Sequence, residues 1–417
     1  MLKLIRPSPR SRSGRRCVAK GLLAAALTLP LTAAALPGVP GTVVDAEPYT
    51  AAWLPSQAAT AYRLTYTTTN VHARPALSTG LVYLPAGRAP AGGWPVVSWA
   101  HGTQGVSDSC APSVSGPQRP ERDGRFLDLF LATGHAVVAS DYQGLGSPGE
   151  HAFLHGATAG RNIVDMVKAA HAFARHLPAG QQLSTRWVSV GHSQGAGAAV
   201  VAGHQASAQG QNALDYRGTF GTGTPVGVES TAALMAPDNR IPYPGPINAY
   251  HAYMLLGLLQ IEPGIDTVLT DVGRQRLALG RQLCLAELAT ALDGATTGEM
   301  FQAPLLTVPG IAPMLAAYFD MPLRGFTQPL MLAHGTDDRD VSYDKALLYA
   351  TELALQEQPV LFRPYPTDHW GILDAAGADG LQFVSARLTA PQGGRGAIID
   401  AAAESAHLQR LLDAAAP

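Results

Sequence analysis

The sequence predicts an α/β protein in which an open, mostly parallel sheet is wrapped by helices and interrupted by a helical insertion. Short apolar segments typical of buried strands alternate with helical segments over residues 60–225 and again from 329 onwards. Residues 186–203 contain a strand, a sharp turn and a helix in direct succession. Between residues 226 and 326 this alternation stops, and helices and Pro-rich turns take its place.

The first part of the chain supplies most of the predicted sheet. Residues 41–56 are a Pro-punctuated lead-in without regular structure, and residues 61–70 and 77–84 alternate apolar and polar side chains. The alternation predicts an antiparallel hairpin at a sheet edge. Further strands are expected at 95–100, 136–140 and near 217–222, and helices at 126–132 and 162–177.

The second part returns to the same alternation after the insertion. The insertion itself contains an apolar helix at 249–259 and one helical run at 272–292. A strand at 329–333, a helix at 343–355, a strand at 360–365 and a final helix near 373–388 follow. The predicted organisation is a signal peptide at 1–36, a core at 37–225, an insertion at 226–326 and the rest of the core at 327–417.

Composition and charge exclude several classes of function. The 417 residues are 47% hydrophobic and 14% charged, with a net charge of −2. This balance is that of a globular protein, and no basic surplus indicates a nucleic-acid partner. Neither H-E-x-x-H nor a paired-Cys motif occurs, and no Gly-rich phosphate loop follows a strand, so we expect no metal and no cofactor.

The N-terminus has the composition of an export signal. Residues 1–16 carry six Lys or Arg and no acid, and residues 18–36 are apolar and end in Ala33-Ala34-Ala35. The segment around Arg15-Arg16 is similar to a twin-arginine signal. An uncleaved membrane anchor is the alternative, although Lys20 interrupts the short apolar run. We therefore predict a secreted or periplasmic protein with no transmembrane segment in the mature chain.

Cleavage of that signal would remove Cys17 and leave Cys110 and Cys284. Two cysteines in an oxidising compartment favour one disulfide between the core and the insertion. The alternative is two separate buried thiols.

The most informative motif is Gly191-His192-Ser193-Gln194-Gly195, which fits G-x-S-x-G between a strand and a helix. A serine at such a turn presents its Oγ, and glycines on both sides leave room for the neighbouring strand and helix. The N–H of Gln194, at the start of the helix, can stabilise a developing oxyanion. The alternative is a Gly-rich helix start with a buried serine cap.

A serine nucleophile needs a base and an acid, and both are expected on later loops at the same sheet edge. The strand at 329–333 is followed by Asp337, Asp338 and Asp340, one of which we expect to cap the next helix. The strand at 360–365 is followed by His369. The order Ser, Asp, His is that of α/β-hydrolases.

Three further histidines and the loop after residues 95–100 are expected to support the site. His192 and His101 are expected to be structural, and His334 to pack behind the acid. The second oxyanion donor should come from the loop after residues 95–100, where we favour the N–H of Thr103 over that of Gln104.

At this level of detail the chain resembles the secretory lipase family of α/β-hydrolases, which includes lipase A-like enzymes. The segments that carry the resemblance are WAHGTQG, DYQGLGSPGEHAFLHGATAGRNIVDMVKAA, GHSQGAGAA, HGTDDRDVS and TDHWG, within residues 60–390. The resemblance implies an α/β-hydrolase fold in which residues 226–326 form a helical cap over the acyl site. It also implies the triad Ser193, Asp338 and His369, because the pattern His-Gly-Thr-x-Asp selects Asp338. Ala196 and Ser342 depart from the usual family pattern, where Gly and Pro are common.

These observations favour a secreted serine carboxylic-ester hydrolase, a lipase or esterase acting on a small-molecule ester or lipid. Cap residues Met254, Leu255, Leu258 and Leu259 are candidates for the acyl site, or alternatively for the core of the cap. An esterase acting on cell-wall carbohydrate esters is the second hypothesis. A peptidase is less favoured, and a non-catalytic binding protein on the same scaffold is opposed by the complete set of triad residues.

Overall fold

The computed structural model describes residues 38–209, 214–390 and 401–415. The predicted signal peptide, residues 1–36, lies outside the described residues. No helix within the described residues has the length and apolar character needed to cross a membrane.

The centre of the structure is a nine-stranded sheet with the strand order β1-β2-β3-β5-β4-β6-β7-β8-β9. Its strands are β1 Val43–Pro48, β2 Ala58–Thr69, β3 Pro75–Pro85, β4 Trp94–Ala100, β5 Ala136–Ser140, β6 Leu183–His192, β7 Asp215–Thr222, β8 Leu330–Gly335 and β9 Val360–Tyr365. Strands β1, β2, β3 and β5 pair antiparallel in succession, and all pairs from β5 through β4 to β9 are parallel. The predicted fold class, an α/β-hydrolase fold with a mostly parallel sheet, is confirmed.

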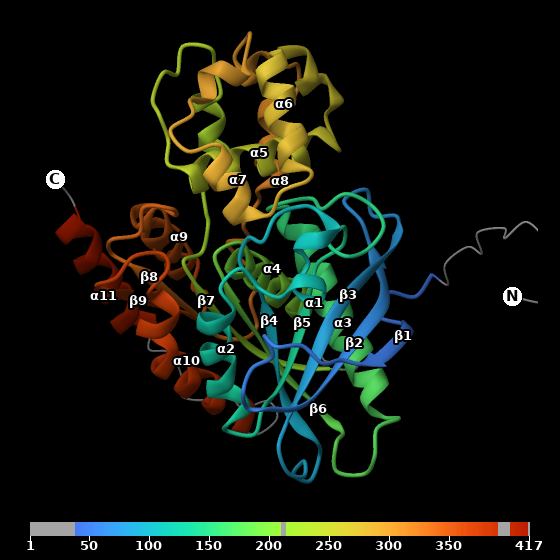
Figure 1. Ribbon diagram of the computed structural model, residues 1–417. Coiled ribbons are helices and arrows are strands. Elements are labelled where there is room, and N and C mark those ends of the chain that lie inside the picture. Colours follow the sequence, from blue (N-terminus) through green and yellow to red (C-terminus); the bar gives the residue numbers. More distant parts are fainter. Residues whose placement is uncertain (1–37, 210–213, 391–400, 416–417) are drawn as a thin grey trace, which may run out of the picture. The chain divides into compact units, whose positions relative to one another are not determined.

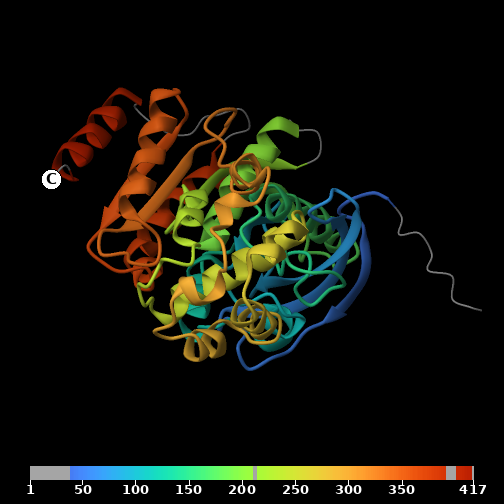
Figure 2. The ribbon, with the colours of Figure 1, turned by 90° about the horizontal axis from the view of Figure 1, so that it is seen from above.

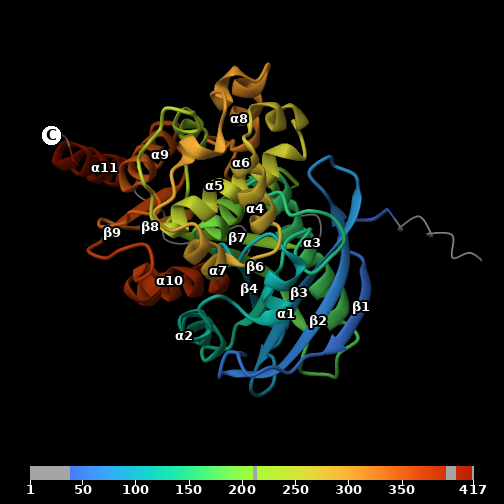
Figure 3. The same ribbon diagram turned by 45° about the horizontal axis from the view of Figure 1, so that its top comes forward.

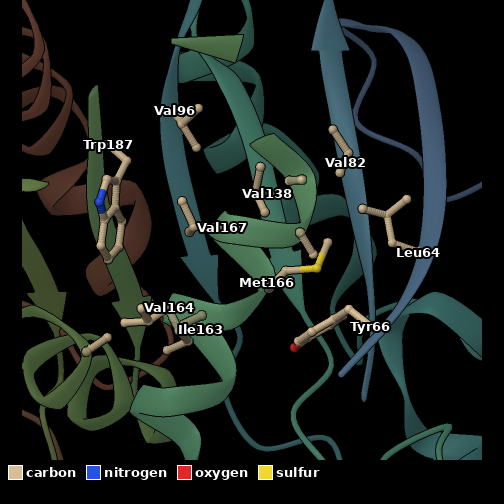
Figure 4. Close-up of a cluster of buried hydrophobic side chains, with 14 of the residues drawn as sticks. Leu64, Tyr66, Val82, Val96, Val138, Ile163, Val164, Met166, Val167 and Trp187 are labelled. Atoms are coloured by element: carbon tan, nitrogen blue, oxygen red, sulfur yellow. The ribbon is translucent and has the colours of Figure 1, made fainter. Parts of the chain in front are cut away.

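Helices cover both faces of this sheet (Figure 1). One face packs against α2 (Pro120–Leu131) and α10 (Ile372–Thr389), and the other against α3 (Gly156–Ala174), α4 (Gln194–Gln209) and α9 (Tyr343–Leu355). Figure 4 shows the second face, where apolar side chains of α3 interdigitate with those of the strands, among them Met166 with Leu64 and Val82. The buried helix faces hold the sheet rigid, and its strand ends therefore make a fixed platform.

The insertion forms a helical layer above the carboxyl ends of the parallel strands (Figures 1 and 3). Its elements are η2 Val228–Leu234, α5 Gly245–Leu259, η3 Pro263–Val268, α6 Asp271–Gly280, α7 Leu285–Ala291, η4 Thr297–Met300, η5 Leu305–Thr307 and α8 Ile311–Tyr318. These elements bury an apolar cluster of their own. The single helix expected at 272–292 was wrong: α6 ends at Gly280, and α7 begins after Cys284, which is its N-cap residue.

Covalent and polar contacts fasten this cap to the core. Cys110, in the short helix η1 (Asp108–Cys110) after β4, is bonded to Cys284, so the predicted disulfide is confirmed. The next amide, that of Leu285, donates to the carbonyl of Gln104 (2.8 Å). Viewed from above, α5 crosses over the sheet, with α6 and α7 beside it (Figure 2).

Two elements were missed from the sequence. Residues 43–48, expected to lack regular structure, form the edge strand β1, which pairs with β2 through its backbone. Helix α11 (Ala401–Ala415) was not anticipated, and it packs on α9 and β9. The remaining strands lie where the periodicity placed them, to within a few residues at the ends, whereas α2 and α3 each begin six residues earlier than expected. The loop expected at 107–120 also contains the short helix α1 (Pro112–Ser115).

Candidate active site

Ser193 occupies a strained turn between β6 and α4. Its φ of 55° lies in the left-handed region, which a non-glycine residue adopts only at a cost of about 1–3 kcal/mol. The backbone N–H of Ser193 donates to the carbonyl of Thr222 on β7 (2.9 Å), which fixes the turn. A side chain at Gly195 would overlap the carbonyl of Ala100 on β4, and one at Gly191 would overlap that of Gly195. The glycines of the motif are therefore required by close backbone approach.

The two proposed oxyanion donors both lie next to Ser193. Gln194 is the first residue of α4, so its N–H has no partner within the helix. Thr103, in the loop after β4, lines two hollows that Ser193 also lines. Gln104, the other candidate, also links neighbouring segments: its carbonyl accepts from the N–H of Leu285, and its side-chain oxygen accepts from the N–H of Gln118 (2.7 Å).

Asp338 lies on the loop after β8 and accepts hydrogen bonds with both oxygens. Its Oδ1 accepts from the backbone N–H groups of Asp340 (2.9 Å) and Val341 (2.8 Å). Its Oδ2 is 2.7 Å from Nδ1 of His369 and 3.2 Å from Nε2 of His334. Burial raises the pKa of this carboxyl, but the hydrogen bonds from His334 and His369 outweigh it and hold the pKa well below its usual range. Asp338 is therefore ionised at neutral pH.

His369 follows β9 and is held between Asp338 and two ring neighbours. Its side chain is buried, and the rings of His192 and Trp370 lie 4.9 and 5.6 Å away between centroids. Since the ionised Asp338 accepts at Nδ1, that nitrogen carries the proton, and Nε2 is left as an acceptor. His369 and Ser193 line the same narrow crevice.

His192 is buried directly behind the site. Its Nδ1 lies 3.1 Å from the hydroxyl of Thr222, and its Nε2 lies 3.4 Å from the guanidinium of Arg122. Burial, followed by the neighbouring His369, lowers the pKa of His192 well below its usual value. It stays neutral and supports the ring of His369, in line with the structural position expected for it.

His101 is also tied to the backbone. Its ring nitrogens lie 2.8 Å from the carbonyl of Gly102 and 3.3 Å from that of Asp141. His334 lies against Asp338 from behind, at the contact given above.

The expectation that one of the three aspartates caps α9 was wrong. The N-cap is Ser342, whose hydroxyl accepts from the N–H of Lys345 (3.3 Å). Asp337 is exposed, and Asp340 accepts a hydrogen bond from the hydroxyl of Tyr250 in the cap (3.1 Å). Ser342, one of the two departures from the family pattern, thus has a defined structural role.

A cavity of about 520 Å³ separates the cap from the catalytic loops. Core residues Ser193, Gln194 and Phe153 form one side. The cap side is formed by one stripe of α5, namely Ile247, Tyr250, His251 and Met254, together with Val226, Val228 and Thr231. Of the four leucine and methionine residues suggested for the acyl site, Met254 lines this cavity, whereas Leu255, Leu258 and Leu259 pack in the apolar cluster of the cap.

Several residues at the site were not singled out in the sequence. Tyr250 and His251 lie in a helix that is otherwise almost wholly apolar, and this contrast was the one available signal. His151 lies in a loop, and no motif in the sequence marks it. Its Nε2 lies 2.8 Å from the side-chain nitrogen of Gln194. Among the described residues, no group of three or more His, Cys, Asp or Glu is arranged to hold a metal ion.

The fold and this arrangement of loops define an α/β-hydrolase. The model of the secretory lipase family matches residues 121–303, which include the serine turn and most of the cap. The resemblance to that family is thereby confirmed, and the match supports a carboxylic ester hydrolase of the lipase and esterase class. The family match and the disulfide indicate an extracellular protein. No curated protein sequence matches the chain.

Solved structures agree with the fold. Lipase A of Candida antarctica in its closed state is 22% identical, with a TM-score of 0.66 over 90% of this chain and 91% of that one. A putative hydrolase from Legionella pneumophila is 21% identical, with a TM-score of 0.68 over 82% of this chain and 97% of that one. A rice cell wall degrading esterase from Xanthomonas oryzae is 18% identical, with a TM-score of 0.62 over 90% and 99%.

Proposed function

We propose that the protein is a secreted serine esterase or lipase that works through an acyl-enzyme intermediate. Ser193 attacks the ester carbonyl, and Nε2 of His369 takes the proton from its Oγ. The C–O bond to the alcohol then breaks, and His369 returns the proton to the leaving oxygen. Water repeats the sequence on the acyl-enzyme and releases the acid.

The observation that carries this proposal is the 2.7 Å hydrogen bond between His369 and the ionised Asp338, in the crevice that Ser193 lines. Asp338 orients the ring and stabilises its charged form during the reaction. The amides of Gln194 and Thr103 would hold the oxyanion, each contributing about 10²–10³-fold in rate. No cofactor is needed for these steps.

The cavity under α5 is the proposed acyl site. It is adjacent to Ser193, and its walls at Phe153, Ile247 and Met254 are apolar. We accordingly divide the protein into a catalytic core at 37–225 and 327–417 and a cap at 226–326. The cap sets the substrate range because it supplies one wall of the cavity.

Hydrolysis of 4-nitrophenyl esters from acetate to palmitate, with Ser193→Ala in parallel, tests the proposal. We expect turnover in the wild type and a loss of at least about 10³-fold in the variant. A peak at medium or long chains supports a lipase, and turnover confined to acetate supports a small-acyl esterase. Turnover that persists in Ser193→Ala would reject the assigned nucleophile.

A carbohydrate-ester esterase is the second candidate, favoured by the fold similarity to the Xanthomonas oryzae enzyme. Hydrolysis of acetylated or feruloylated sugars ahead of all nitrophenyl alkanoates would select it. Covalent labelling by a fluorophosphonate, absent in Ser193→Ala, separates both candidates from a non-catalytic scaffold.

The proposed cellular location of the protein rests on its N-terminal sequence. We propose that residues 1–36 are an export signal of the twin-arginine type and are removed on secretion. N-terminal sequencing of the exported protein tests this: a mature chain that begins near residue 37 is expected, and one that still begins at Met1 would refute it.

A further inference from the structure

His251 is a buried polar side chain in the wall of the proposed acyl cavity. It lies on α5, has a relative exposure of 4%, and lines the same cavity as Ser193. Its Nδ1 is buried without a hydrogen-bond partner, and its ring meets that of Tyr243 edge to face at 5.5 Å. Buried polar atoms in native proteins are normally paired. Because Nδ1 itself is covered, the ring nitrogen left to pair with a ligand in the cavity is Nε2.

The chemistry of this position is that of a neutral imidazole. Burial lowers the pKa of His251 to about 4, so the ring is uncharged at neutral pH and offers one donor and one acceptor. A hydrocarbon chain in the cavity would leave the donor and the acceptor of the ring unpaired. A hydroxyl group both donates and accepts, and it therefore pairs with the ring in either tautomer.

Three other polar side chains of the cavity wall are differently placed or already paired. The hydroxyl of Tyr250 donates to Asp340 (3.1 Å), and that of Thr231 donates to the carbonyl of Val228 (2.7 Å). Gln194 also has an unpartnered side-chain oxygen, but it adjoins Ser193 on the core side. A substrate group bound by the side chain of Gln194 would lie near the ester carbonyl. A group bound by His251 would lie on the cap side of the cavity, farther along the acyl chain.

We propose that His251 is a specificity-determining residue that binds a hydroxyl group on the acyl chain, so that the preferred substrates are esters of hydroxyalkanoic acids. This inference rests on the proposed function and specifies its substrate class. It predicts selectivity for one hydroxyl position, because α5 is held to the core by the Tyr250–Asp340 contact and packs on α7, which the disulfide ties to the core.

The test compares 4-nitrophenyl octanoate with its 3-, 6-, 7- and 8-hydroxy derivatives; the 4- and 5-hydroxy esters are omitted because they lactonise. For one position we expect kcat/KM of the wild type to exceed that for octanoate by about 5–30-fold, the value of one well-placed hydrogen bond. The ratio should fall to about one in His251→Leu and recover in part in His251→Gln.

His171→Leu is the matched control, since it makes the same chemical change on α3, outside the cavity wall. It should keep the full ratio. A ratio near one at every position in the wild type, or a ratio retained in His251→Leu, would overturn the inference while leaving ester hydrolysis intact. If neither plain nor hydroxylated esters are cleaved, the proposed function fails and the inference with it.

Discussion

Breaking the disulfide between Cys110 and Cys284 should cost about a third or more of a typical domain's stability. The bridge closes a loop with a sequence separation of 174 residues. In the chain-entropy treatment, a loop of this length contributes about 5 kcal/mol to the free energy of unfolding, against about 5–15 kcal/mol for a whole domain. The double variant Cys110→Ala/Cys284→Ala should therefore unfold at a much lower urea concentration.

The position of the bridge also predicts which part is lost first. Cys110 belongs to the core, and Cys284 begins α7 in the cap, whose apolar cluster is separate from those of the sheet. Without the bridge, the cap is held to the core by contacts such as Tyr250 with Asp340 and Tyr318 with the carbonyl of Phe153. We expect the cap to open before the sheet, and hydrogen exchange of α5 and α7 should accelerate more than that of β4 and β6.

Equilibrium urea unfolding, followed by circular dichroism under oxidising conditions, measures the effect. Either single variant already breaks the bridge, so Cys110→Ala and Cys284→Ala should each lose nearly as much as the double variant. A loss below about 1 kcal/mol in the double variant would refute the loop-closure reasoning. Equal acceleration of exchange in cap and sheet would refute the separate opening of the cap.

Two further changes test the catalytic geometry. Asp338→Asn should lower kcat by about 10³–10⁴-fold, measured with a 4-nitrophenyl ester. The amide oxygen would keep the backbone N–H groups of Asp340 and Val341, so the amide NH2 would face His369 and could not accept a hydrogen bond from Nδ1. The lowered pKa of Asp338 stabilises the fold above the unfolded carboxyl value of about 3.9, and this contribution is lost as the pH falls towards the folded value. The same variant should therefore show a weaker acid dependence of its unfolding free energy below about pH 5; an unchanged acid dependence would contradict the assignment. Gly195→Ala should yield no folded protein, because the added Cβ would overlap the carbonyl of Ala100. Gly197→Ala is the matched control: its added Cβ would lie 3.6 Å from Pro225, and the variant should raise the stability measured by thermal unfolding by up to about 1 kcal/mol. A soluble, active Gly195→Ala variant would contradict the packing argument.

The sheet could be predicted because burial imposes a pattern on most of its strands. β5 is enclosed on both faces and is a short apolar run, and β2 and β3 are rich in β-branched and aromatic residues. β1 has no such pattern: it is an edge strand of largely exposed residues held by backbone bonds to β2, so its pairing depends on β2 and not on its own side chains. α11 is likewise fixed by distant partners, since Glu404 accepts from the N–H of Phe362 on β9 (2.7 Å).

The candidate site was predictable where a motif fixes both residue type and topology. Ser193, Asp338 and His369 each follow a predicted strand, so the sheet alone brings their loops to one edge. The N-cap of α9 was misassigned because four residues between 337 and 342, three Asp and Ser342, all suit capping. Asp338 does not cap the helix: its oxygens accept hydrogen bonds from the backbone of its own loop and from His369. The sequence alone does not show which of the three aspartates makes these contacts.

The cavity face of α5 could not be predicted for a related reason. The helix is apolar on nearly all sides, so no hydrophobic stripe distinguishes the face that packs in the cap from the face above Ser193. In the structure the cavity face runs through residues 247, 250, 251 and 254, a helical spacing that carries Tyr250 and His251. A polar side chain that faces the apolar cluster of the cap needs an internal partner, as the hydroxyl of Tyr253 has in the carbonyl of Leu283 (2.9 Å). Tyr250 and His251 line the cavity instead, and a substitution at either should alter substrate preference more than one at Leu255 or Leu258, which are buried in the cap.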